Sequence, residues 1–322
     1  MNSPIFIFSL PRAGSTLLQR ILMGHQEICS ISEPWILLPY IYASKKEGIL
    51  SEYSSLTAHT GVEDFINNLP NQKKDYIEAQ RKFITELYTK QCKKEEKYFL
   101  DKTPRYYLII DEIVELFPDA KFIFIFRNPI QIYASIIKTW GKGRFRNIIS
   151  SYYDLIKGTK KLSEGYIKHK EKSYAINYED LILNSENKLE EICNYLEIPM
   201  KQEILTQFSI QDTRGNLGDP TGVLKYKEIS DEGLYSWENV FNSSIRKRFA
   251  ISLLKKLDDQ DLLLQNYDKT KVISQIKKLN NKKNNLFFID IIDFTISSLI
   301  RKFKLNLFIN KNFKWIRKEP LS

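Results

Sequence analysis

The chain has 322 residues, of which 43% are hydrophobic and 27% charged, with 19 Phe and 18 Tyr. This is enough apolar material for one large core or two modest ones, and it excludes disorder, a collagen-like repeat and a small disulfide scaffold. The formal net charge is +10, yet positions 269–322 hold 13 of the 49 Lys and Arg residues and only 3 of the 39 Asp and Glu residues. Positions 1–268 are therefore balanced in charge, and we expect no nucleic-acid partner for them.

The three cysteines and three histidines are widely scattered. Cys29, Cys92 and Cys193 form no CxxC pair and have no histidine at metal-binding spacing, so we expect reduced thiols and no metal site. A buried-looking strand begins within five residues of the start, which leaves no room for a signal peptide, and no apolar run reaches the roughly 18 residues of a spanning helix. These features predict a cytoplasmic protein.

Short apolar runs alternate with segments of helical periodicity. In chain order, the pattern predicts strand Ile5–Ser9, helix Ser15–Met23, strand Ile28–Ser32, a helix from about Pro34, helix Asp75–Cys92, strand Tyr98–Leu100, helix Tyr106–Phe117, strand Lys121–Phe126, helix Ile130–Trp140, strand Ser173–Tyr178 and helix Ser185–Leu196. The run KFIFIF at Lys121–Phe126 is apolar on both faces, as at the centre of a parallel sheet. The pattern predicts an α/β fold with an open parallel sheet and helices on both faces, which binds ligands at the carboxyl ends of its strands.

Two regions stand apart from this alternation. Residues 45–97 are an expected insertion, of which 45–72 are polar and irregular. Residues 269–322 are an expected basic amphipathic extension of a body at 1–268, because polar residues recur every three or four positions from Leu286 to Ile309 among Phe, Ile and Leu. Through 286–318 this extension either lies on an anionic membrane surface or packs on the body or a second subunit, and we favour packing.

The segment FIFSLPRAGSTLLQR reads as strand, tight loop and helix. At such a junction the free backbone N–H groups and the helix dipole favour an anion. Gly14 lets the backbone approach closely, Ser15 and Thr16 add hydroxyls, and Arg12 adds a cation. The pattern GxxxxGK[ST] is absent, so this is not a Walker A loop, and the alternative is a well-capped helix after a Pro turn.

A second anion site is expected after the strand Lys121–Phe126. Arg127 follows the strand, Asn128 and Pro129 are typical of a helix start, and Ser135 lies eight residues after Arg127. A guanidinium and a hydroxyl so placed can hold one phosphate together, and the alternative is a structural ion pair with a solvent-facing serine. Walker-type NTPases place a magnesium-binding Asp at a neighbouring strand end. Here the strand ends in Arg127, which indicates phosphate binding by cations without magnesium.

These segments resemble those of a known family. LPRAGSTLLQR resembles the 5′-phosphosulfate loop of sulfotransferases that use 3′-phosphoadenosine 5′-phosphosulfate (PAPS), and RNPIQIYAS resembles their 3′-phosphate motif. ISEPW, FLDKTPRYY, INYEDL and LGDPTGV resemble further landmarks of a bacterial branch, in the same order. The resemblance covers about Pro4 to Leu257 and implies a P-loop-like fold and in-line transfer of a sulfuryl group from PAPS to an acceptor hydroxyl or amine.

The resemblance also implies catalytic roles. Arg12, which is Arg in the tyrosylprotein branch as well, stabilises charge on the leaving phosphate, and Lys102 contacts the transferring group, with Arg105 as its possible substitute. Glu33 is the expected base, because it follows the second strand and lies 21 residues after Arg12, as in the tyrosylprotein enzymes. Its alternative role is a charge at a helix N-terminus. His25 is the competing base, although it falls in a turn away from the strand ends.

The donor nucleotide is then expected to bind a set of loop and strand-end residues. They are Arg12, Ala13, Gly14, Ser15, Thr16, Arg127, Ser135, Tyr178 and Lys225. For Tyr178 and the loop from Gly218 to Lys225, a core tyrosine and an ordinary turn remain open as alternatives. Trp35, Tyr106 and Trp140 either line an acceptor pocket or pack in the core.

The leading hypothesis is thus a PAPS-dependent sulfotransferase with no metal, acting on a small-molecule, sugar or lipid acceptor. One alternative is a magnesium-dependent nucleotide or metabolite kinase on a P-loop-like fold. The other is a non-catalytic nucleotide-binding module recruited to a membrane. The expected location is the cytoplasm, with peripheral contact to the inner membrane surface as an option.

Overall fold

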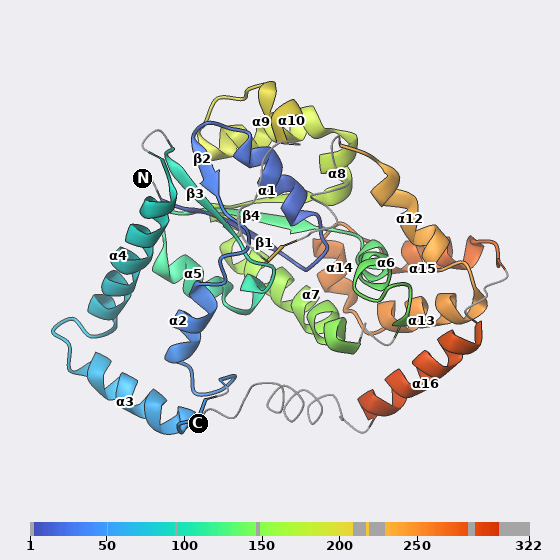
Figure 1. The fold of residues 1–322 in the computed structure, drawn as a ribbon, viewed down its shortest axis with the longest axis horizontal. Coiled ribbons are helices and arrows are strands. Elements are labelled where there is room, and N and C mark those ends of the chain that lie inside the picture. Colours follow the sequence, from blue (N-terminus) through green and yellow to red (C-terminus); the bar gives the residue numbers. More distant parts are fainter. Residues whose placement is uncertain are drawn as a thin grey trace.

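The protein was analysed as a computed structural model, which describes residues 3–49, 51–93, 96–145, 149–208, 217–218, 229–282 and 287–302. Five parallel strands form one sheet in the order β2-β3-β1-β4-β5 (Figure 1). The strands are β1 Ile5–Ser9, β2 Ile28–Ser30, β3 Tyr98–Lys102, β4 Lys121–Phe126 and β5 Ser173–Asn177. Since all pairs are parallel, the carboxyl ends of the strands meet at one edge of the sheet.

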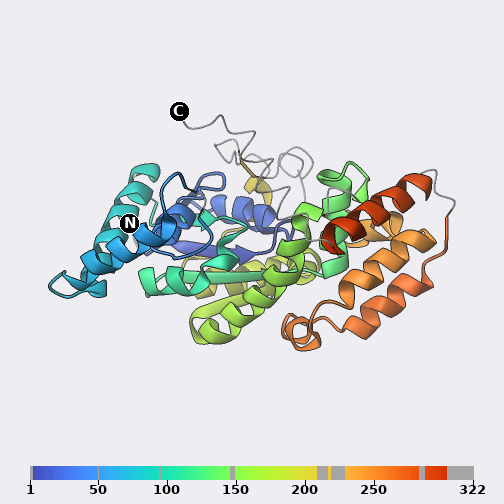
Figure 2. The same cartoon turned by 90° about the horizontal axis from the view of Figure 1, so that it is seen from below.

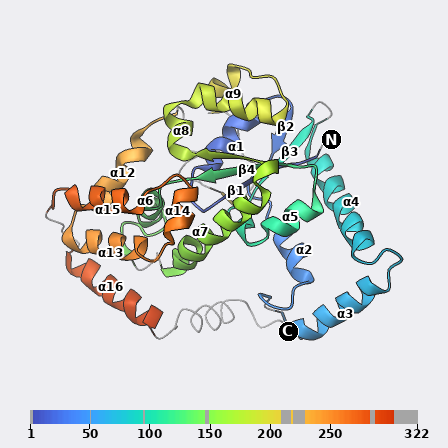
Figure 3. The ribbon, with the colours of Figure 1, turned by 180° about the vertical axis from the view of Figure 1, so that it is seen from behind.

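Helices connect the strands and extend the molecule at both ends of the sheet (Figures 1 and 3). The α-helices are α1 Ser15–Met23, α2 Leu37–Ala43, α3 Ser55–Asn67, α4 Lys73–Gln91, α5 Ile110–Leu116, α6 Pro129–Thr139, α7 Ile149–His169, α8 Tyr178–Leu183, α9 Ser185–Leu196, α10 Glu203–Gln207, α12 Glu232–Val240, α13 Ser244–Leu254, α14 Asp259–Leu264, α15 Lys269–Lys278 and α16 Phe287–Lys302. Two 3₁₀ turns are η1 Tyr106–Leu108 and η3 Lys170–Lys172.

The central strands β1 and β4 alternate Phe and Ile, and this alternation separates two cores. Phe6 and Phe122 pair in register, stack with ring centroids 6.1 Å apart and face a cluster with α4, α5, α6 and α7. Ile7 and Ile123 face the opposite cluster with α1, α8, α9 and α10. All four side chains are fully buried, which is worth roughly 1.5–3 kcal/mol for each. The predicted α/β fold, with helices on both faces of an open parallel sheet, is confirmed (Figure 2).

Local structure differs from expectation in the first insertion and around the second strand. Residues 45–72 are not irregular throughout, because α3 forms and the Ser54 hydroxyl accepts from the Thr57 amide at 3.3 Å. β2 ends at Ser30, and the next helix begins at Leu37 rather than near Pro34. The cause of the late start is Trp35, whose left-handed φ of 57° does not belong to a helix.

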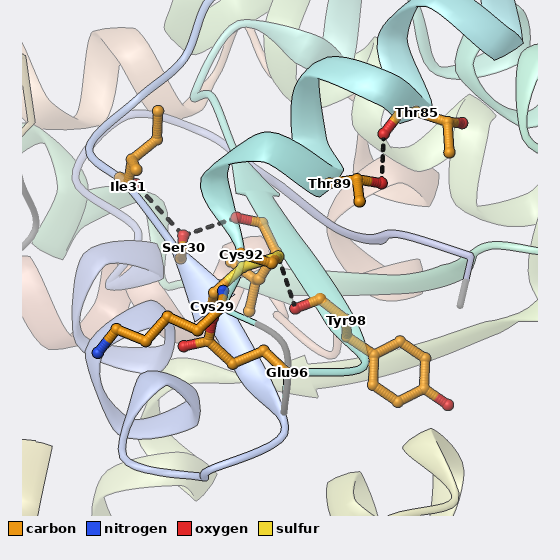
Figure 4. Close-up of a disulfide and its surroundings, with 10 residues drawn as sticks. Cys29, Ser30, Ile31, Thr85, Thr89, Cys92, Glu96 and Tyr98 are labelled. Atoms are coloured by element: carbon orange, nitrogen blue, oxygen red, sulfur yellow. Dashed lines mark hydrogen bonds between the residues drawn. A yellow bond between two sulfur atoms is a disulfide. The ribbon is translucent and has the colours of Figure 1, made fainter. Parts of the chain in front are cut away.

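The expectation of reduced thiols is wrong for two of the three cysteines. Cys29 on β2 and Cys92 just after α4 form a disulfide that closes a separation of 63 residues (Figure 4). The fold brings their Cα atoms to 5.7 Å, a proximity that sequence spacing does not reveal. Cys193 is free and buried.

The C-terminal helices pack on neighbouring helices of the body rather than standing apart from it. α15 contributes Val272 and Ile276 to the same core cluster as Phe6, and α16 packs against α13 (Figure 1). The predicted helix from Leu286 therefore exists and packs on the body, while residues 303–318 of the expected contact segment lie outside the described residues. Among the helices that the structure describes, none has the length and apolarity needed to cross a bilayer.

Candidate active site

Two residues of the loop between β1 and α1 have positive φ angles, which is the left-handed backbone conformation. Arg12 and Gly14 have φ angles of 67° and 96°. A Cβ at Gly14 would lie 2.2 Å from Cδ2 of Tyr178, so this close approach requires glycine. Ser15 and Thr16 begin α1 and line a cavity together with Arg12 and Gly14. Backbone N–H groups, hydroxyls and a guanidinium thus converge as in an anion cradle.

Arg127, the first residue after β4, joins three segments at the same place. Its guanidinium donates to the carbonyls of Arg12 and Gly233, each at 2.9 Å. It also donates to the side-chain oxygen of Gln131 at 3.0 Å and lies 4.0 Å from the ring centroid of Tyr178. Arg127 is only 8% exposed. It therefore holds the β1–α1 loop, α6 and α12 around one point.

The helix that follows Arg127 completes this arrangement. The Asn128 side chain accepts from the Ile130 amide at 3.1 Å and Pro129 occupies the first turn, so α6 begins as the sequence predicted. Ser135 lies in the second turn, and its hydroxyl accepts from Nε of Arg12 at 3.1 Å. The two segments predicted to bind anions, separate in the sequence, are thus in direct contact.

A carboxylate stands next to this cradle. Lys102, at the end of β3, donates from Nζ to Oε1 of Glu33 at 2.9 Å and to the Thr16 hydroxyl at 3.3 Å. The indole Nε1 of Trp35 donates to Oε2 of Glu33 at 3.1 Å. Both oxygens of Glu33 are therefore oriented. The side chain of Lys102 is 1% exposed and that of Glu33 is 12% exposed, so the pair is largely shielded from water.

Sequence reasoning missed how the loop that carries Glu33 is held. The Trp35 amide donates to the Thr103 hydroxyl at 3.2 Å. Thr103 in turn donates to Asp101, as does the hydroxyl of Tyr106 at 2.9 Å. Asp101 is fully buried, and desolvation by burial raises the pKa of its carboxyl to about 6. A threonine two residues after a buried aspartate carries no sequence signal for this role.

One cavity of 1030 Å³ contains most of the expected site. The predicted residues on its wall are Arg12, Gly14, Ser15, Thr16, Glu33, Arg127, Ser135 and Tyr178. Trp35, Pro104, Arg105, Lys138 and Trp140 also line this cavity. Aromatic and cationic side chains therefore share the cavity with the Glu33 carboxylate.

Several predicted residues differ from expectation in their position or lie away from the cavity wall. Ala13 is buried in the loop backbone at 1% exposure. Tyr178 does not end β5 but begins α8, under the β1–α1 loop. Gly218 lines the cavity, whereas Lys225 lies outside the described residues. Tyr106 is fully buried and packs in the core rather than in a pocket.

His25, the competing base, is held away from the cavity. Nδ1 accepts from the Glu27 amide and Nε2 lies 3.1 Å from the carbonyl of Pro199, so neighbours occupy both ring nitrogens. Burial lowers the pKa of this imidazole. Arg105, the substitute for Lys102, reaches the cavity wall and pairs with Asp154 at 2.9 Å.

Comparisons with known proteins agree with this geometry. A profile of the sulfotransferase family matches residues 4–202. The nodulation protein NoeE of Sinorhizobium fredii is 33% identical over 137 residues, which is 42% of this chain and 31% of that protein. A putative protein-tyrosine sulfotransferase of Caenorhabditis briggsae is 24% identical over 261 residues, 79% of this chain and 85% of that protein. The sulfotransferase domain of the curacin biosynthetic pathway shares the fold, with a TM-score of 0.52, 22% identity and coverage of 80% of this chain and 99% of that domain.

Proposed function

Because the chain belongs to the sulfotransferase family, we propose that its cavity binds PAPS and transfers the sulfuryl group to a hydroxyl or amine of an acceptor. Membership of the family confirms the enzyme class predicted from the motifs and favours it over a kinase or a non-catalytic module. The observation that carries the proposal is the convergence of two anion-binding segments and a shielded Glu33–Lys102 pair at one cavity.

The donor would lie along the cradle side of the cavity. Ser15 and Thr16, with the N-terminal amides of α1, suit the 5′-phosphosulfate. Arg127 and Ser135 suit the 3′-phosphate, since both line the cavity and a guanidinium and a hydroxyl can bind one phosphate together. Ala13, Gly14 and Tyr178 shape the loop, and Lys225 stays a prediction. The proposal uses these cations and amides to neutralise phosphate charge and assigns no metal.

Glu33 is the proposed base. As the acceptor oxygen or nitrogen forms its bond to sulfur, the bond from sulfur to the 5′-phosphate oxygen breaks, and Glu33 takes the acceptor proton. Negative charge grows on the departing phosphate, next to Arg12 and Lys102. Lys102 donates to both Glu33 and Thr16. Its ammonium can therefore orient Glu33 before the transfer and stabilise the departing phosphate during the transfer.

The acceptor would enter on the side bordered by Trp35, Arg105 and Trp140. We propose a small-molecule, sugar or lipid acceptor, and cytoplasmic location remains part of the proposal. The Cys29–Cys92 disulfide argues against that location, because protein disulfides are typical of oxidising compartments. Incubating metabolite and lipid extracts with radiolabelled PAPS would identify the acceptor class.

The 3′-phosphate site can be tested without an acceptor. We expect 3′-phosphoadenosine 5′-phosphate (PAP) to raise the melting temperature strongly and 5′-AMP to raise it little, since binding stabilises the folded state by mass action. Arg127→Ala should remove the difference between the two ligands. Because Arg127 also bonds to Arg12 and Gly233, Ser135→Ala serves as a milder variant that should reduce the same difference.

Equal stabilisation of the wild type by PAP and AMP would contradict the assignment of the 3′-phosphate. The kinase alternative makes the opposite forecast: ATP with Mg²⁺ would stabilise the protein, and a chelator would abolish activity.

A further inference from the structure

Helix α16 packs on the body with acidic residues buried and apolar residues exposed. Its acidic residues face inward, where Asp290 and Asp293 are each 1% exposed. Most of its described apolar residues face outward, with Phe288 76% and Ile292 54% exposed, while Phe294 packs against Phe249 of α13. Phe287, Ile291, Ile296 and Leu299 are exposed on the same helix by 40–47%. An amphipathic helix on a water-soluble body normally buries its apolar stripe, so this outward face requires a different explanation.

Two bidentate ion pairs fix this orientation. Arg246 of α13 donates from Nε and Nη2 to Asp290 at 2.7 and 2.8 Å. Arg144, in the loop after α6, donates from Nε and Nη2 to Asp293 at 3.2 and 2.8 Å. Rolling α16 to bury its apolar face would leave these buried charges unpaired, which is costly. The helix is therefore held with its exposed apolar residues outward.

The charge around this face indicates its partner. Positions 269–322 contain three acidic residues. Asp290 and Asp293 form the two ion pairs, and Glu319 is the third. The segment that leads to α16 exposes Lys277, Lys278 and Lys282. By sequence, positions 303–318 add five more Lys and Arg residues. An apolar stripe among cations fits a surface of anionic lipid headgroups over acyl chains.

A second copy of this chain is a poorer partner for the same face. A symmetric dimer through α16 would bring together two copies of a segment, 269–322, in which 13 Lys and Arg outnumber 3 acidic residues, and like charges in proximity disfavour association. We propose that the exposed face of α16, defined by Phe288, Ile292, Ile296 and Leu299, docks the protein on the surface of an anionic membrane. The inference is independent of the proposed function, because it concerns partition to lipid and not transfer chemistry.

Vesicle co-sedimentation of the full chain tests the inference. We expect binding to phosphatidylglycerol–phosphatidylcholine vesicles and little binding to pure phosphatidylcholine. The double variant Phe288→Asp/Ile292→Asp should lower the partition coefficient at least about tenfold, because two apolar anchors become anionic. The matched control is Leu56→Asp/Phe65→Asp, which changes two exposed residues of the same kind on α3 and should leave binding unchanged. Circular dichroism melting curves without ligand report that each variant is folded.

Three outcomes would overturn the inference. They are equal binding to both kinds of vesicle, unchanged binding of the α16 variant, and a dimer in light scattering that the α16 variant dissolves while vesicles capture nothing. The last result would assign the face to a second copy. Unchanged binding of the α16 variant would assign membrane attraction to the remaining basic residues alone.

Discussion

The two loops that meet at the cavity are held in different ways. The turn of the β1–α1 loop depends on its own Gly14, which permits the left-handed backbone, and the loop is then anchored through Arg12 to Arg127 and Ser135. The loop after β2 carries Glu33 on a left-handed Trp35 and depends on Thr103 and the buried Asp101 from another strand. The turn of the proposed donor site is therefore encoded locally at Gly14, while the loop of the proposed base is positioned by residues from another strand. Variants can separate these two kinds of support.

The largest expected effect is on the base itself. Glu33→Gln should lower turnover by roughly 10²–10⁴, the usual contribution of a positioned base, and leave the PAP melting shift intact. Steady-state kinetics with the identified acceptor, beside melting curves with PAP, would measure both. If the variant loses nucleotide binding as much as turnover, Glu33 belongs to the donor site and the contrast between the loops fails.

The next effect concerns the covalent link near the Glu33 loop. Reducing the Cys29–Cys92 disulfide should lower the free energy of unfolding by about 4 kcal/mol, because a loop of 63 residues is released in the unfolded chain. Urea unfolding with and without reductant measures this difference. In a Cys29→Ser/Cys92→Ser variant, reductant should have no further effect. Three titratable thiols in the unreduced, denatured protein would show that no disulfide forms.

Asp101 should make stability depend on pH. Its pKa is about 6 in the fold against 3.8 unfolded, so the folded state binds more protons between these values, and its contribution is full below about pH 4 and lost as pH rises through 6. The loss is about 3 kcal/mol. Asp101→Asn should remove this slope, as urea unfolding at pH 4, 5, 6 and 7 would measure. Identical slopes in both proteins would count against a buried, proton-binding Asp101.

The smallest expected effect is at Trp35, which positions the base without reacting. Trp35→Phe keeps the ring and removes the N–H that donates to Glu33, so kcat should fall about tenfold while the KM for PAPS stays constant. Initial rates at varied PAPS would show the split. An unchanged kcat would remove Trp35 from the support of Glu33, and a parallel rise of the KM for PAPS would place it in the donor site.

Local features of the chain were predictable because their causes lie within a few residues. The alternation of Phe and Ile in β1 and β4 determined which side chains face each core, and Asn128 with Pro129 determined the start of α6. The turn at Gly14 follows from the same kind of backbone chemistry. The local backbone structure of both predicted anion-binding segments could therefore be inferred from the sequence.

Contacts across long separations were decided only by the tertiary structure. Lys102 reaches Glu33 over 69 residues, Cys29 joins Cys92 over 63, and Arg144 holds Asp293 over 149. An amphipathic pattern predicted the helix at α16 but not which of its faces turns inward. That choice depends on arginines placed by other elements, and the local periodicity of a helix contains no information about them.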